Sequence, residues 1–215
     1  MKKVTNRIII VGIFAIAMAY LESVIVVYLR DIYEIKDLLN DLITEIDKYT
    51  IIEIGREIMT LFMLAIIGYL AGRNLQEKLG YSIFAFGIWD IFYYVWLYVF
   101  IGWPQSLLEW DILFLVPLPW WGPVLSPVII AILMAVGGTV AIIKSFKKVK
   151  IRLNIFDWSL FISSIFLALI IFMKDAIWVL PNGIEAVASV RPTSFNWPVF
   201  LIPIAGMVLF VYRLS

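Results

Sequence analysis

The feature that most constrains this sequence is a series of apolar runs, each close to the roughly 20 residues that a helix needs to cross a bilayer. They lie near residues 8–29, 51–72, 79–101, 124–143, 155–173 and 195–212. Hydrophobic residues make up 63% of the chain and charged residues 15%, whereas a soluble domain carries about 25% charged residues. In lipid a chain must satisfy its own backbone hydrogen bonds, so such runs fold as helices. The sequence predicts an all-α integral membrane helical bundle, one transmembrane domain over 1–215 with about six spans.

Lysine and arginine are distributed unevenly over the connections between these runs. With the N-terminus inside, one side of the membrane holds eleven of them, including the dense cluster from Lys144 to Arg152, and the other side holds six. Membrane proteins keep the richer side in the cytoplasm. The sequence therefore predicts a multi-pass protein of the cell (cytoplasmic) membrane with both termini in the cytoplasm.

Two of the predicted outer connections have unusual sequences. Residues 31–49 carry apolar side chains at helical spacing and acids on the remaining faces, which predicts an amphipathic helix on the outer surface; a partner-binding helix is the alternative. Residues 102–127 hold five prolines and four tryptophans. Prolines at this density interrupt a helix and tryptophans favour the headgroup region. We therefore expect a Pro/Trp-rich cap that is interfacial or partly re-entrant.

The residues that usually hold redox metals are absent from this sequence. The chain contains no Cys and no His, which are the usual ligands of Fe–S clusters, copper, zinc and haem, so no such cofactor is expected. A bound metal would have oxygen ligands, which favours a hard divalent or alkali cation. The net charge of +1 provides no basic face for nucleic acid. The expected partners are the lipid bilayer and other membrane subunits.

Five ionisable residues fall inside the predicted spans: Glu22, Glu53, Arg56, Glu57 and Asp90. At a rise of about 1.5 Å per residue, the acids lie in the outer half of the membrane or at its midplane. Charges at this depth are costly unless they are paired, wetted or neutralised. Several acids beside one base must keep a proton or bind a cation. We predict that these residues form one ion- or ligand-binding site.

Three further residues are secondary candidates for this site, namely Tyr93, Tyr94 and Asp111. A tyrosine hydroxyl of a neighbouring helix, or that of Tyr93 or Tyr94 in the third span, could hydrogen-bond Asp90. Glu22 favours a ligand-binding role because the neighbouring residues of its own helix offer no polar partner.

A structural interpretation stands beside each functional one. The pair Arg56 and Glu57, and a bond between Asp90 and a tyrosine, would then only hold helices in register. Asp111 would be a wet loop residue. The aromatic series of the third span would be a packing or lipid-facing surface.

Four segments of the chain have distinctive sequences: 19–30 (from A-Y-L-E to Y-L-R), 53–57, 86–96 with its W-D-I-F-Y-Y run, and 110–117 with the sequence W-D-I-L-F-L-V-P. In these segments the chain resembles an uncharacterised family of prokaryotic polytopic membrane proteins, over roughly the first 130 residues. No activity is attached to that family, so the resemblance implies a multi-span membrane protein and no mechanism. Residues 31–49 depart from its pattern.

Three functions remain open at this point. The leading hypothesis is a cation- or proton-linked carrier or binding protein that uses the intramembrane carboxylates. The alternatives are a membrane-embedded enzyme acting on a lipid-like substrate, and a non-catalytic subunit of a larger membrane complex. No serine–base nucleophile pair, P-loop or dinucleotide fingerprint is present, which weakens the interpretation of the chain as an ATPase or a dehydrogenase.

Overall fold

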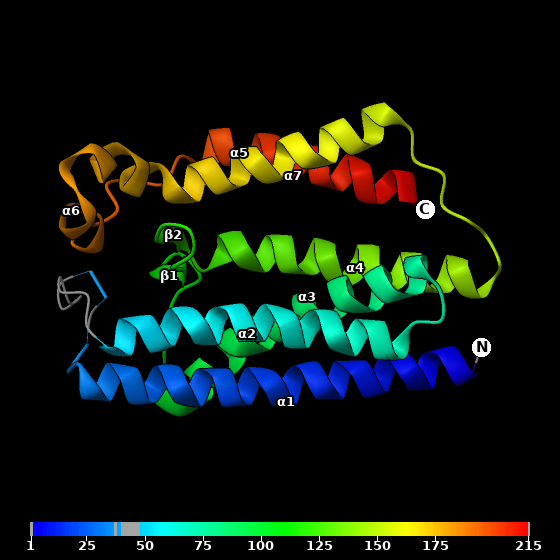
Figure 1. Ribbon diagram of the computed structural model, residues 1–215, viewed down its shortest axis with the longest axis horizontal. Coiled ribbons are helices and arrows are strands. Elements are labelled where there is room, and N and C mark those ends of the chain that lie inside the picture. Colours follow the sequence, from blue (N-terminus) through cyan, green and yellow to red (C-terminus); the bar gives the residue numbers. More distant parts are fainter. Residues whose placement is uncertain (1, 37, 40–47, 215) are drawn as a thin grey trace.

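The computed structural model describes residues 2–36, 38–39 and 48–214. Helices dominate this part of the chain, and a short hairpin interrupts them (Figure 1). The elements, in chain order, are α1 (Lys2–Ile32), α2 (Lys48–Ala71), α3 (Leu75–Ile101), β1 (Trp110–Phe114), β2 (Trp120–Pro123), α4 (Leu125–Phe146), α5 (Ile155–Val179), the 3-10 turn η1 (Leu180–Asn182), α6 (Ile184–Ala188) and α7 (Trp197–Leu214).

Five of these helical segments are long and apolar enough to cross a membrane: Lys2–Ile32, Leu75–Ile101, Leu125–Phe146, Ile155–Asn182 and Trp197–Leu214. Large apolar side chains are exposed along all of them, as contact with lipid tails requires. The chain is thus a multi-pass helical membrane protein, as its apolar runs predict. Each predicted span has a helix, but α2 is not among these five, so the number of six spans stays a prediction.

The predicted surface helix over 31–49 falls partly on undescribed residues. In the structure α1 continues through Ile32, turns follow at residues 33–34 and 38–39, and α2 already begins at Lys48. The described part of the segment is therefore not one continuous helix. Residues 37 and 40–47 lie outside the described part of the chain.

The helices form two groups that run along the long axis of the molecule (Figure 1). In the first group α3 packs against α1, α2 and α4. In the second α5 pairs with α7, and α7 also contacts α4 and so joins the groups. The termini and the α4–α5 connection lie toward one end, and the hairpin and α6 lie at the other. The start of α1 and the end of α7 therefore lie toward the same end of the bundle, and the cytoplasmic location of both termini stays a prediction.

Glycines allow α3 and α4 to approach closely. A Cβ atom on Gly138 of α4 would lie 2.7 Å from the backbone nitrogen of Phe84, and one on Gly87 of α3 would lie 2.8 Å from that of Ala135. Both distances are shorter than real Cβ contacts, so only glycine permits this separation. These contacts fix α3 against α4, and α3 is the helix that carries Asp90.

The Pro/Trp-rich segment contains a two-stranded antiparallel hairpin that the sequence did not predict. Asp111 of β1 faces Gly122 of β2, and Ile112 faces Trp121. Residues 115–119 form the turn, where Pro117 and Pro119 need no ladder hydrogen bond. The expectation of a proline-interrupted, non-helical cap is compatible with this arrangement, and its backbone groups pair as strands.

Candidate functional site

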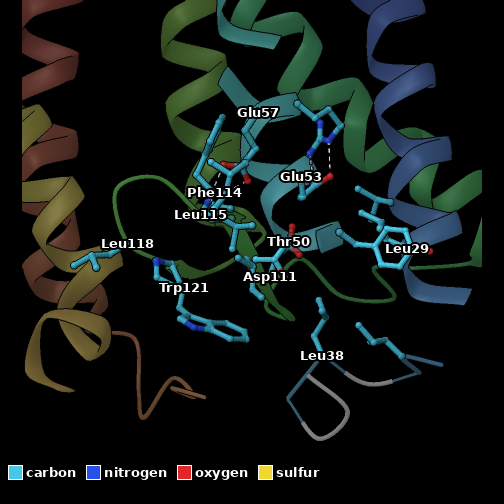
Figure 2. A pocket seen from close by; sticks show the side chains of 18 of the residues that line it. Leu29, Leu38, Thr50, Glu53, Glu57, Asp111, Phe114, Leu115, Leu118 and Trp121 are labelled. Atoms are coloured by element: carbon cyan, nitrogen blue, oxygen red, sulfur yellow. Dashed lines mark hydrogen bonds and ion pairs between the residues drawn. The ribbon is translucent and has the colours of Figure 1, made fainter. Parts of the chain in front are cut away.

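A cavity of about 340 Å³ lies at the end of the bundle that carries the hairpin (Figure 2). Its walls come from the last third of α1, the first turns of α2, the middle of α3, the hairpin and α6. Most of the lining is apolar, and a set of charged and aromatic side chains projects into it. All eight residues singled out from the sequence line this one cavity: Glu22, Glu53, Arg56, Glu57, Asp90, Tyr93, Tyr94 and Asp111.

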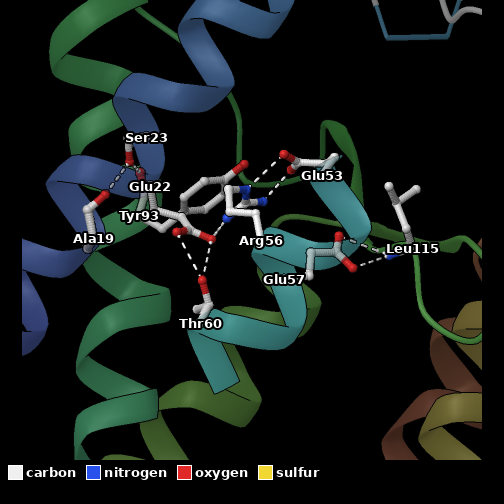
Figure 3. Close-up of polar contacts among 9 residues, drawn as sticks. All are labelled: Ala19, Glu22, Ser23, Glu53, Arg56, Glu57, Thr60, Tyr93 and Leu115. Carbon is white, nitrogen blue, oxygen red and sulfur yellow. Dashed lines mark hydrogen bonds and ion pairs between the residues drawn. The ribbon is translucent and has the colours of Figure 1, made fainter. Parts of the chain in front are cut away.

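One guanidinium holds two of the acids together (Figure 3). Arg56 forms ion pairs with Glu22 of α1 and with Glu53 of its own helix, and its Nε donates to Glu53 at 2.8 Å. The Thr60 hydroxyl also donates to the Glu22 carboxylate, at 3.2 and 3.3 Å to its two oxygens. The expectation that Glu22 lacks a polar partner is wrong, because its partners come from α2 and not from its own helix. Together these groups tie α1 to α2.

Glu57 makes a second contact between elements, from α2 to the hairpin turn. Both of its carboxylate oxygens accept from the backbone N–H of Leu115, at 3.0 Å each. Glu57 is buried, and this contact attaches the hairpin turn to α2 (Figure 3). The structure differs here from the predicted pair of Arg56 with Glu57. Arg56 pairs with Glu22 and Glu53, and Glu57 is bonded to Leu115.

Asp111 is a buried residue of the hairpin and not a wet loop residue. Its side chain is 4% exposed, and Tyr94 donates its hydroxyl to Asp111 Oδ2 at 3.0 Å. Burial raises the pKa of Asp111 to about 6, although the positive charge of Arg30 and the Tyr94 hydrogen bond oppose that shift. The tyrosine bond predicted for Asp90 is thus made to Asp111.

Asp90 is the one acid of the cavity that is left without such a contact in the described part of the chain. It lies in the middle of α3, is half-buried and lines the cavity. No hydrogen bond and no ion pair reaches its carboxyl group from the described residues, and Asp111 is near enough to repel it. The Tyr93 hydroxyl, three residues along on the same face, also has no hydrogen-bond partner among them.

Sequence reasoning did not identify two groups of lining residues. Arg30 lies two helical turns beyond Glu22 on the same face of α1, a spacing that could have signalled it. Its guanidinium stacks on Trp103 at 4.1 Å. Trp89 and Trp121 also line the cavity, 5% and 2% exposed, and their buried indole N–H groups have no acceptor in the described part of the chain. No sequence signal marks Trp121, because the hairpin that positions it was not predicted.

The cavity carries an excess of acids. Among the described residues that line it, five carry carboxyl groups and two carry guanidinium groups. Within the same residues, no group of three or more acids is placed to hold a metal ion. A cavity of this kind can accept a proton or a positively charged ligand, because either one reduces the repulsion between the acids.

Comparison of the chain with models of protein families, with curated proteins and with solved structures finds no match.

Proposed function

We propose that the protein is a membrane carrier or binding protein that takes up a cation or a proton in this cavity. The observation that supports it is the Asp90 carboxyl, which lines the cavity and has no partner among the described residues. An unpaired ionised acid at this depth is costly. Binding of a cation or a proton at Asp90 therefore lowers the free energy of the protein.

The other acids support a division of roles. Glu22 and Glu53 share the single positive charge of Arg56 through two ion pairs, and Glu57 is bonded to the hairpin. These three residues hold the walls of the cavity. Asp90 and Asp111 repel one another across the remaining space. In the proposal Asp90 binds the cation or the proton, and Asp111, held by Tyr94, increases the attraction for positive charge.

Flux measurements on purified protein in liposomes test the proposal. We expect uptake driven by a proton or cation gradient, read with a pH dye enclosed in the liposomes and with radioactive Na⁺ or K⁺. Asp90→Asn keeps the shape of the side chain and removes its charge, so it should reduce uptake at least tenfold. Glu185→Gln is the matched control, because Glu185 is exposed on α6 and does not line the cavity.

Binding is measured separately from flux. A protein that binds but does not carry would show proton release or cation binding that depends on Asp90, without uptake. If wild type and Asp90→Asn are equal in both measurements, the proposal is wrong. Assembly with other membrane subunits would then be the function to pursue.

A further inference from the structure

We propose that the ligand of this cavity is an organic ammonium compound, a protonated amine with an apolar body, and that Asp90 is its counter-ion. This inference rests on the proposed function and names the chemical class of the cation. It is carried by the walls of the cavity, its size, and the arrangement of side chains on one face of α3.

The walls favour an apolar ligand body. Aliphatic side chains from α1, α2, the hairpin, α6 and the segment after α6 line it, among them Val26, Ile54, Ile112, Leu118, Val187 and Val190. A hard inorganic cation requires about six to eight oxygen ligands or its own water shell, and aliphatic walls supply neither. Contact between an organic body and these walls is favourable, because it removes apolar surface of both the ligand and the protein from water.

The size of the cavity fits the same class. Small-molecule sites in proteins have volumes of about 300–1,000 Å³, and the cavity has about 340 Å³. One water molecule occupies about 30 Å³ in the liquid, so the space far exceeds that of a bare ion. A compact amine with one ring or a short chain fills it.

One face of α3 provides what an ammonium group needs. Asp90 supplies a carboxylate without a partner in the described chain, and Tyr93 supplies a hydroxyl in the same condition. The rings of Trp89 and Tyr93 are stacked, with centroids 6.3 Å apart. Aromatic faces attract ammonium groups through their electron-rich surface. A carboxylate beside two such rings therefore recognises an organic cation better than a neutral molecule or an anion.

The indole groups add a second requirement. The N–H groups of Trp89 and Trp121 are buried and lack an acceptor among the described residues, a condition that destabilises the protein. An oxygen of the ligand could satisfy either group. The inferred class therefore includes amines that also carry a hydrogen-bond acceptor, either as free compounds or in an aminated lipid headgroup.

Matched probes test the inference on the full chain in nanodiscs of phosphatidylglycerol, a lipid without an amine. The probes are 4-phenylbutylamine and its neutral counterpart 4-phenylbutanol, which share the same apolar body. Binding is read by tryptophan fluorescence and calorimetry, with the signal of empty nanodiscs subtracted. We expect the amine to bind at least tenfold more tightly than the alcohol. Asp90→Asn should remove this preference, and Glu185→Gln should keep it.

A thermal measurement keeps the test decisive if Asp90→Asn does not fold. In that case the amine should raise the unfolding midpoint of the wild-type protein and the alcohol should not. Nanodiscs that contain phosphatidylethanolamine separate the two sources of the amine. Weaker binding of 4-phenylbutylamine in these nanodiscs identifies a lipid headgroup as the competing ligand, and unchanged binding identifies a free amine.

The outcomes distinguish this inference from the proposed function. Equal binding of both probes, or equal amine binding by wild type and Asp90→Asn, overturns the organic amine. If Asp90-dependent uptake of protons or inorganic cations persists in that case, the proposed function stands without it. If that uptake is absent as well, both proposals fall.

Discussion

The backbone N–H of Leu115 donates to both carboxylate oxygens of Glu57, across 58 residues of sequence and at 3.0 Å to each oxygen. This contact joins the hairpin turn to α2 and so holds one wall of the cavity against another. Hydrogen bonds to charged acceptors contribute about 1.5–3 kcal/mol to stability.

The first prediction concerns this contact. Glu57→Leu should lower the free energy of unfolding by about 1.5–3 kcal/mol, because it removes the acceptor of the Leu115 N–H. Glu57→Gln should cost less than half as much, because its amide oxygen still accepts. Unfolding in SDS and hydrogen exchange at Leu115 measure both effects. Equal losses for the two variants would contradict a role for the hydrogen bond.

The second prediction concerns the ion pair of Arg56 with Glu22. Breaking a buried pair by removing one partner costs about 3–5 kcal/mol, because the other charge is left unpaired. Arg56→Gln should therefore be strongly destabilising, and so should Glu22→Gln to a smaller extent, since Glu53 still neutralises Arg56. In the double variant the losses should fall short of their sum by about 1 kcal/mol or more. Additive losses would show that the two side chains do not interact.

The third prediction concerns pH. The pKa of Asp111 is raised from 3.8 to about 6 by burial, so the folded state favours the protonated acid. This contribution to stability is complete below about pH 4 and is lost as the pH rises through about 6. Thermal midpoints of wild type should fall across that interval, and those of Asp111→Asn should fall less, because Asn stays neutral. Parallel curves for the two proteins would rule out Asp111 as the titrating group.

The fourth prediction compares two glycines. Gly138→Ala should destabilise the protein by about 1–3 kcal/mol, because its methyl group meets the backbone of α3. Gly55 of α2 has nothing within 4 Å of the same position, so Gly55→Ala should be neutral or stabilising by up to about 1 kcal/mol. Thermal unfolding of both variants in one detergent checks the difference. A harmless Gly138→Ala would show that α3 and α4 lie farther apart.

The sequence was most informative about the helices, because lipid forces a long apolar run into a helix whatever surrounds it. It did not show the hairpin, because strand pairing depends on contacts between residues such as Asp111 and Gly122, and the prolines on either side obscure the alternation. The same limit explains the error over Asp111, which becomes buried only once the hairpin folds.

The residues of the candidate site could be selected from the sequence because charges are rare in membrane helices. The partner of each charged side chain could not be predicted, since it depends on which faces of the helices pack together. Glu22 illustrates this: its own helix offers no partner, yet Arg56 and Thr60 reach it from α2. Asp90 has no partner in the described part of the chain, and the hydroxyl of Tyr94, which could have bonded it, donates to Asp111.

The depth at which the cavity stops has a consequence for any transport cycle. Beyond Glu22 and Thr60, toward the end of the bundle that carries the termini, α1, α2 and α3 pack together in a hydrophobic core that includes Val11, Ala15 and Leu64. A solute bound at Asp90 would have to pass these packed side chains to cross the membrane. Translocation, as opposed to capture, therefore demands a second conformer in which this core opens.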